Sequence, residues 1–423
     1  MTKDHPAGKT TRRAFMRGAV AGGVGTLAAG GAANAAGDGA ILEVQPWARE
    51  LGAGVDASGY GMPSPHEAGV HRTPVDWLTA DPFASINFTP IHKLDGIITP
   101  NGVCFERHHS GAAQIDPAAH RLMINGLVER ELVFTMDDLQ RLPRENHVYF
   151  LECTANSGME WRGPQLNGVQ FTHGMIHNVM YTGVPLRVLL AEAGVKPSGK
   201  WVLFEGADAA GLTRSVPMEK VMDDCLVAFA MNGEALRVEQ GYPLRLVIPG
   251  WEGNMWIKWL RRIEVGDAPW HAKEETSKYT DLMPDGRARR FTWVMDAKSV
   301  ITSPSPQMPI RHGKGRMMLT GLAWSGRGTI PRVDVTLDGG KNWHMARMDG
   351  PSLDKSLHRF YYDFNWDGGE MLLQSRAHDN TGYVQPTKAA LRALRGVNST
   401  YHNNGIQTWH VGRDGEVENV EIS

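Results

Sequence analysis

The chain changes character near Ser299, and this change limits what it can fold into more than any other feature. Before that point, apolar strand-like segments alternate with short amphipathic ones such as 185–193, which begins with proline and is followed by glycine, like a capped helix. After it, short alternating strands such as 332–337 recur with Gly, Asp and Asn in the turns. A chain of 423 residues also exceeds one ordinary core. We therefore expect an α+β domain over residues 37–297 and an immunoglobulin-like β-sandwich over residues 298–423.

Two local patterns in the first domain predict single elements. Thr135, with Asp138 three residues later, has the pattern of an N-terminal cap and predicts a short helix over residues 136–142. The apolar segment 148–151 predicts a short strand, which would deliver Cys153 into a loop of small and polar residues.

The first 36 residues have the pattern of an export signal. Arg12-Arg13 precedes a weakly apolar Gly/Ala-rich run over 18–33, and small residues at 33–35 fit a cleavage site. This predicts a twin-arginine signal over residues 1–36 and a periplasmic mature protein. A membrane anchor is the alternative, but the run is too short and too weakly apolar for a stable span.

The remaining composition narrows the class of protein. No later segment has the run of about 20 apolar residues that a membrane-spanning helix requires. The net charge of −2 gives no reason to expect a nucleic-acid partner. Three cysteines are an odd number for an exported chain, so at least one is free, paired between chains or bound to a ligand. No Cys-x-x-Cys pair is present, so the sequence predicts neither a c-type haem nor an iron–sulfur cluster.

Cys153 is the strongest candidate for a functional cysteine. A lone cysteine after a buried strand is more often an inert core thiol than a metal ligand. The loop that it opens, however, contains small residues whose backbone can approach a bound group closely. A soft thiolate also suits a metal that must stay attached through redox cycling.

Cationic and donor side chains recur in other loops and at strand ends, as a phosphate-bearing organic ligand would require. The segment 105–109 carries Arg107 and two histidines, and Arg245 and Lys258 follow later in the chain. Arginine binds phosphate with two parallel hydrogen bonds and lysine binds it as a point charge. Each residue also has a plain alternative, because the histidines could lie on the surface or bind a metal, and Arg245 and Lys258 could be solvated strand residues.

Several motifs, taken together and in order, resemble the sulfite oxidase family of molybdenum enzymes over roughly residues 95–412. The motifs are Phe105-x-Arg107-x-His109, Cys153-x-x-Asn156, Phe204-Glu205-Gly206-x-Asp208, Met231-Asn232-Gly233, Gly241-Tyr242-Pro243-Leu244-Arg245, Lys258-Trp259-Leu260, Ala323-Trp324-Ser325-Gly326, Arg332-Val333-Asp334-Val335 and Asp338-Gly339-Gly340. The resemblance implies a molybdenum–molybdopterin cofactor with Cys153 as the ligand of the metal, and a C-terminal dimerisation domain.

The same resemblance implies roles for individual residues. Cofactor contacts are expected from Phe105, Arg107, His108, His109, Cys153, Asp208, Gln240, Arg245, Trp256, Ile257 and Lys258. Arg107 and Tyr279 are expected to stabilise charge on oxygen during catalysis, with Arg359 as a further cation facing the substrate. Tyr279 could alternatively be a packed loop residue.

Residues 241–258 and 275–286 resemble one branch of the family, the molybdenum subunit of sulfane dehydrogenases. Members of this branch act on sulfane sulfur held as a persulfide on a carrier protein in thiosulfate oxidation, and pass electrons to a dihaem cytochrome c subunit. The resemblance therefore implies both partners, together with a homodimer that could extend to a heterotetramer.

Departures from the sulfite-oxidising pattern favour the same branch. Sulfite oxidases carry an arginine pair where this chain has Ser157 and Gly158, and a pocket tryptophan where it has Phe171. A family histidine near the cofactor phosphate is replaced by Gln240, which can donate a hydrogen bond but carries no charge. The pair Thr154-Ala155 is also unusual. A dehydrogenase of free sulfite and a non-catalytic protein with a structural Cys153 remain as alternatives.

Overall fold

A computed structural model describes residues 50–51, 61, 63–75 and 81–422, so the predicted export signal lies outside the described residues. Residues 63–423 form one structural unit. In the described part of this unit, no helix is both long and apolar enough to cross a membrane.

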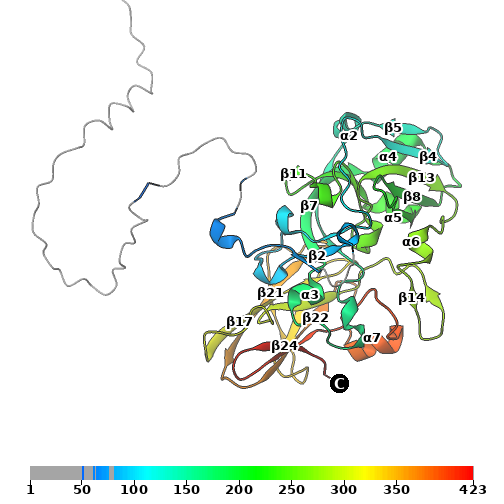
Figure 1. The fold of residues 1–423 in the computed structure, drawn as a ribbon. Coiled ribbons are helices and arrows are strands. Elements are labelled where there is room, and N and C mark those ends of the chain that lie inside the picture. Colours follow the sequence, from blue (N-terminus) through cyan, green and yellow to red (C-terminus); the bar gives the residue numbers. More distant parts are fainter. Residues whose placement is uncertain (1–49, 52–60, 62, 76–80, 423) are drawn as a thin grey trace, which may run out of the picture. The chain divides into compact units, whose positions relative to one another are not determined.

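The first part of the chain contains two five-stranded sheets (Figure 1). In one, the strands run in the order β11 (Glu234–Ala235), β10 (Leu226–Met231), β7 (Ile176–Pro185) and β6 (Glu145–Glu152), with β12 (Arg245–Val247) paired to β10. In the other, the order is β5 (Leu132–Phe134), β4 (Leu122–Gly126), β13 (Leu260–Gly266), β8 (Trp201–Gly206) and β9 (Thr213–Pro217). Pairing in both sheets is antiparallel except between β4 and β13.

Short helices lie between these strands, and they include the two predicted over residues 136–142 and 185–193, each within one residue of its expected bounds. They are α2 (Met136–Arg141), α3 (Val169–His173), α4 (Leu186–Ala193), α5 (Met218–Asp223) and α6 (Lys273–Thr276). Thr135 and Asp138 form the expected capping box at α2, which satisfies backbone N–H groups of the first turn. Gly194, with φ of 71°, ends α4 in the left-handed conformation that glycine adopts without a steric penalty.

Two small hairpin-like sheets complete this part of the structure. Strands β1 (Thr73–Pro74), β2 (Ile86–Phe88) and β3 (Glu106–Arg107) form a three-stranded sheet in the lead-in segment, the described residues before β4, which otherwise contains turns and short 3-10 helices. Strands β14 (Asp281–Leu282) and β15 (Ala288–Arg289) pair with each other after α6.

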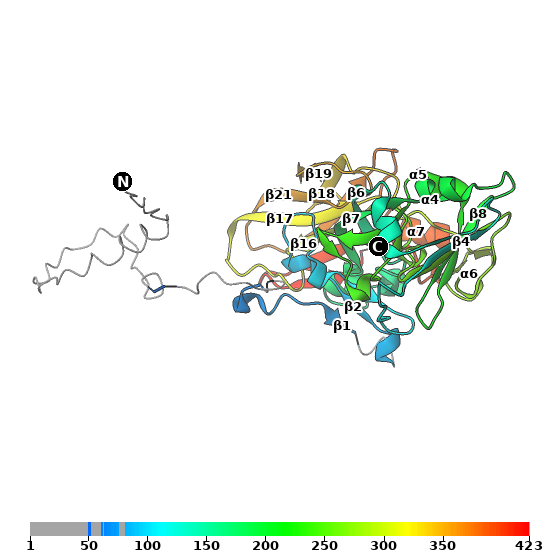
Figure 2. The same ribbon diagram turned by 90° about the horizontal axis from the view of Figure 1, so that it is seen from above.

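The C-terminal part is sheet-rich, as predicted, and contains two antiparallel sheets (Figure 2). One contains, in order, β16 (Lys298–Ser303), β17 (Gly315–Trp324), β21 (His358–Trp366) and β20 (Arg347–Asp349). The other contains β19 (His344–Met345), β18 (Arg332–Thr336), β22 (Met371–His378), β23 (Thr408–Val411) and β24 (Val417–Val420). Fully buried Trp324, Phe360 and Trp409 belong to the core between them, and burying each such side chain stabilises the fold by about 2 kcal/mol or more. Helix α7 (Lys388–Arg395) precedes β23.

The backbones of the two parts meet at a pair of glycines. A Cβ atom on Gly326 would lie 2.0 Å from the carbonyl oxygen of Gly250, and one on Gly250 would lie 2.2 Å from the carbonyl oxygen of Gly326. Gly250 also has φ of 76°, a conformation that other residues rarely adopt. Met295 connects the two segments, because its N–H donates to the carbonyl oxygen of Gly250 and its own carbonyl oxygen accepts from the N–H of Gly326.

We predict that Gly326→Ala lowers the free energy of unfolding by about 1–3 kcal/mol or more, because the added methyl group overlaps a main-chain carbonyl that cannot move aside. Thermal unfolding of the purified protein measures this. Gly102→Ala is the control, since a Cβ atom there lies 3.6 Å from the tip of the Arg237 side chain. Equal unfolding midpoints for the two variants would contradict the prediction.

Candidate active site

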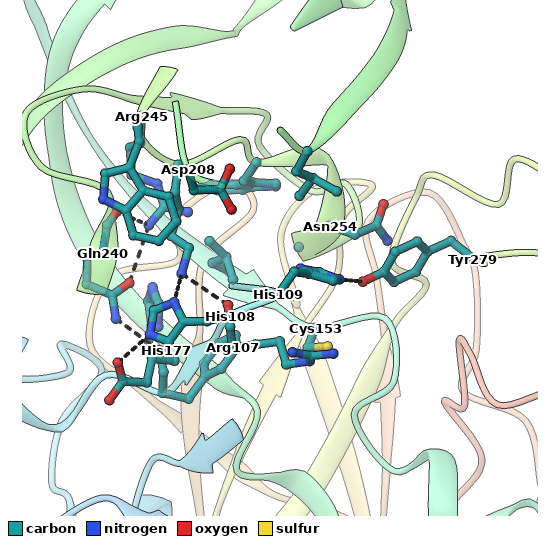
Figure 3. Close-up of a pocket in the computed structure, with 18 residues that line it drawn as sticks. Arg107, His108, His109, Cys153, His177, Asp208, Gln240, Arg245, Asn254 and Tyr279 are labelled. Atoms are coloured by element: carbon teal, nitrogen blue, oxygen red, sulfur yellow. Dashed lines mark hydrogen bonds and ion pairs between the residues drawn. The ribbon is translucent and has the colours of Figure 1, made fainter. Parts of the chain in front are cut away.

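A pocket between the sheets of the first part collects most of the residues singled out in the sequence (Figure 3). The lining residues are Phe105, Glu106, Arg107, His108, His109, Leu151, Cys153, His177, Asp208, Leu212, Gln240, Arg245, Gly253, Asn254, Trp256, Lys258, Trp259 and Tyr279. Most come from β3, from the ends of β6, β8 and β12, and from the loops next to these strands, while His177 lies on β7 and Tyr279 follows α6. Segments far apart in sequence therefore converge on one site.

Cys153 reaches the pocket because strand β6 ends directly before it. Its backbone N–H donates to Met175 at 2.9 Å, and its carbonyl accepts from Asn156 at 2.9 Å in the following turn. The other two cysteines are buried, whereas Cys153 keeps partial exposure. Burial raises the pKa of the Cys153 thiol, and the nearby guanidinium of Arg107 opposes this rise. A bound cation at the sulfur would favour the thiolate further.

Arg245 and Lys258 form the cationic end of the pocket, and an isolated antiparallel bridge holds them together. Lys258 Nζ lies 2.8 Å from His108 Nδ1 and donates to the carbonyl oxygens of Arg107 and Glu239. Burial, together with the charge of Arg245, lowers the pKa of Lys258 to about 7. An anion in this part of the pocket would restore the charge of Lys258 and offset the cost of burying two cations.

Two polar atoms at this end of the pocket indicate the same kind of ligand. Within the described residues, Arg245 Nε and His177 Nδ1 are buried without a hydrogen-bond partner. Arg245 donates instead through Nη1 to Gln240, at 3.0 Å from its carbonyl oxygen and 3.3 Å from its side-chain oxygen. A buried donor without a partner is costly, and a phosphate or pterin acceptor would satisfy it. The residues present thus fit a phosphate-bearing cofactor.

Arg107 and Tyr279 lie near Cys153 at the other end of the pocket (Figure 3). Tyr279 Oη and His109 Nε2 share a hydrogen bond of 3.2 Å. Burial, followed by the charge of Arg107, lowers the pKa of His109 to about 4, so this histidine is neutral near pH 7. Arg107 uses one nitrogen to donate to Ala84 at 2.8 Å. A guanidinium and a hydroxyl beside the Cys153 sulfur can bind and polarise an anionic substrate there.

Three expectations differ from what the structure shows. Arg359, expected to face substrate, lies on β21 outside the lining residues and donates to the carbonyls of Leu94 and Gly96 at 2.8 and 2.7 Å. Its guanidinium therefore anchors the lead-in segment. Ile257 is fully buried beside the pocket and does not line it. Phe171, aligned with a pocket tryptophan, packs edge-on against a phenylalanine of β2 instead.

The pocket also contains residues that the sequence did not single out as site residues. Leu151, His177 and Leu212 are examples. His177 lies on β7 with 1 % of its surface exposed, and burial holds its pKa well below the usual range. A histidine within a strand segment was the one available signal, and it does not separate a site histidine from a structural one. Leu151 and Leu212 carry no such signal.

Comparisons with known proteins identify the family that has this site. Residues 109–274 match a model of the oxidoreductase molybdopterin binding domain, and residues 289–409 match the Mo-co oxidoreductase dimerisation domain. Sulfite oxidase of Gallus gallus is 30 % identical over 74 % of this chain and 72 % of its own length. The chain belongs to the sulfite oxidase family.

Other members of the sulfite oxidase family are also similar. Mitochondrial sulfite oxidase of Mus musculus is 29 % identical, and this chain spans 62 % of its length. The crystal structure of the sulfane dehydrogenase SoxCD from Paracoccus pantotrophus contains a chain with 66 % identity and a TM-score of 0.90, over 92 % of this chain and all of that one. The comparisons confirm the predicted molybdenum oxidoreductase, its molybdenum–molybdopterin cofactor and its two-part fold.

We predict that Lys258→Met reduces the cofactor retained after purification, because it removes a charge-assisted contact worth about 1.5–3 kcal/mol. Molybdopterin per chain, measured by fluorescence of the oxidised pterin, reports the loss. Lys220→Met is the matched control, because Lys220 is also largely buried and its partner Asp224 keeps Lys355 at 2.7 Å. Full retention in Lys258→Met would remove this residue from the cofactor site.

Proposed function

We propose that this protein is the molybdenum subunit of a periplasmic sulfane dehydrogenase. In this proposal it oxidises sulfane sulfur bound to a carrier protein during thiosulfate oxidation and passes electrons to a dihaem cytochrome c subunit. The observation that carries the proposal is the 66 % identity to the SoxCD chain along the whole of that chain. The two sulfite oxidases described above are 30 % and 29 % identical to this chain.

The loop after Cys153 supports this choice of substrate. A sulfite-oxidising enzyme is expected to carry arginine where this chain has Ser157 and Gly158. A Cβ atom on Gly158 would lie 2.4 Å from the carbonyl oxygen of Thr400, so the loop has no space for a side chain at that position. Ser157 is 5 % exposed and donates to Thr172 at 2.8 Å. Fewer fixed cations weaken a site for free sulfite dianion, which needs charge compensation.

The residues of the pocket have separate roles in the proposed reaction. When bound, molybdenum–molybdopterin supplies a centre that removes two electrons from sulfur. Cys153 would hold the metal, and Arg245, Lys258 and His108 would hold the phosphate end of the cofactor. Arg107 would pair with negative charge that develops on the sulfur substrate, and Tyr279 would orient it through the hydroxyl shared with His109.

The domain boundaries and the assembly form part of the same proposal. We infer a leader over 1–36, a molybdopterin domain over 37–297 and a sandwich over 298–423 that joins two copies. The twin arginines at 12–13 support export in the folded state, because that route carries proteins with cofactors already inserted. If each chain pairs with one other copy through the sandwich and binds one cytochrome subunit, the assembly is a heterotetramer.

The substrate test compares two sulfur donors with the exported holoenzyme and its cytochrome partner. We predict reduction of cytochrome c by carrier-bound sulfane sulfur and rates at least about 100-fold lower with free sulfite, a ratio that corresponds to about 2.7 kcal/mol. Stopped-flow absorbance of the haem measures both rates. Rapid turnover of free sulfite would identify a sulfite dehydrogenase with the same cofactor.

The role of Arg107 has its own test. We predict that Arg107→Gln lowers kcat/KM for the sulfur substrate by about 100-fold, because a fixed charge next to the reacting atoms is lost. Steady-state cytochrome reduction measures the change, with molybdenum content determined in the same samples. Arg121→Gln is the control, because Arg121 is exposed and donates only to nearby main-chain carbonyls. A normal kcat/KM would assign Arg107 no catalytic role.

A further inference from the structure

Glu152, the residue before Cys153, lies in an unusual environment. Its side chain is completely buried, and three donors bind its carboxylate. Lys298 Nζ and Asn156 Nδ2 each donate to Oε1 at 2.9 Å, and Trp324 Nε1 donates to Oε2 at 2.7 Å. Two of these donors belong to the C-terminal sandwich, because Lys298 begins β16 and Trp324 ends β17.

The same lysine also contacts the loop that carries Cys153. Lys298 Nζ donates to the carbonyl oxygen of Asn156 at 3.2 Å, and Asn156 in turn closes the turn that begins at Cys153. The Asn156 side chain accepts from the N–H of Met175 at 3.1 Å. The carbonyl oxygen of Asn156 and both polar atoms of its side chain are thus bound.

A second segment of the C-terminal part also contacts the loop that follows Cys153. His402 donates its N–H to Thr154 at 2.6 Å, and Asn403 Nδ2 donates to Ser157 at 3.1 Å. The close approach of Thr400 to Gly158 belongs to the same contact. The loop over residues 153–158 is therefore bound both by Lys298 of β16 and by residues 400–403 of the C-terminal part.

We infer that the C-terminal sandwich is part of the catalytic machinery, with Lys298 and Trp324 acting through Glu152 as positioning residues for the Cys153 thiolate. This inference rests on the proposed role of Cys153 as the ligand of the metal. Contacts behind a ligand fix its orientation, and their loss typically lowers activity by about 10- to 100-fold. A sandwich that only joined two copies would have no need for an ion pair beneath the metal ligand, where burying charge is expensive.

The test removes the ion pair and observes the metal directly. Glu152→Gln with Lys298→Met removes both charges together, so neither is left buried and unpaired. The matched control is Asp334→Asn with Arg376→Met, which removes a carboxylate that is 1 % exposed and its partner at 3.0 Å from the same sandwich, within the pairing of β18 and β22. Both holoenzymes are compared with wild type by electron paramagnetic resonance of molybdenum, metal content, kcat and KM.

The inference predicts a changed molybdenum spectrum in the Glu152/Lys298 variant, or loss of the metal from the folded protein. It also predicts a fall of about 10- to 100-fold in kcat with little change in KM. The control should keep the wild-type spectrum and kcat even where its unfolding midpoint falls equally. Identical spectra and kcat in the two variants would overturn the inference.

Two further variants keep the result decisive. If the Glu152/Lys298 variant does not fold, Trp324→Phe removes one donor to the carboxylate while keeping an aromatic ring, and the same spectral comparison then decides. Cys153→Ala tests the ligand assignment, since retention of a wild-type spectrum would disprove that role and the inference with it. The paramagnetic Mo(V) state is generated with a chemical reductant instead of the sulfur substrate, so a negative result with carrier-bound sulfur alone would reject the proposed function and leave this inference intact.

Discussion

The buried carboxylate of Glu152 is the point on which the rest of the structure depends. An ionised carboxylate without water is unfavourable unless donors surround it, and here the donors come from three separate segments of the chain. Donors from β16 and β17 thus complete the hydrogen bonding at the end of β6 in the first part of the molecule. Packing between the two parts, usually a matter of apolar area, here also includes hydrogen bonds to the residues on both sides of Cys153.

The pocket also depends on how buried charges are placed. Cations gather at one end of it, where burial already lowers the pKa of Lys258 to about 7. Burying cations without a counter-charge is unfavourable, so this end of the pocket favours a negatively charged ligand over a neutral one. The opposite end places a thiol beside a guanidinium, so that one cavity has a soft, reactive end and a hard, ionic end. A ligand with a metal–sulfur head and a phosphate tail matches both.

Much of this organisation could be predicted from the sequence, and the exceptions have physical causes. The capping box at Thr135, the strand before Cys153 and the series of short strands after Ser299 are local patterns, and local energetics determine them. The ordered motifs predicted many of the residues that line the pocket. Arg359 lies outside the pocket, because the sequence alone does not show which carbonyl groups an arginine side chain will bind. His177 escaped because only the pairing of β7 brings its side chain to the cavity.

The contact of Gly250 with Gly326 has a consequence for how such chains can change. Because main-chain atoms from the two parts touch directly, neither part can accept a side chain at this position without displacing the other. The two halves are therefore poor candidates for free exchange between relatives. A chimaera that joins the molybdopterin half of one family member to the sandwich of another would pack correctly at this junction only if both parents have glycine there. Substitutions in the two halves are therefore coupled at this point.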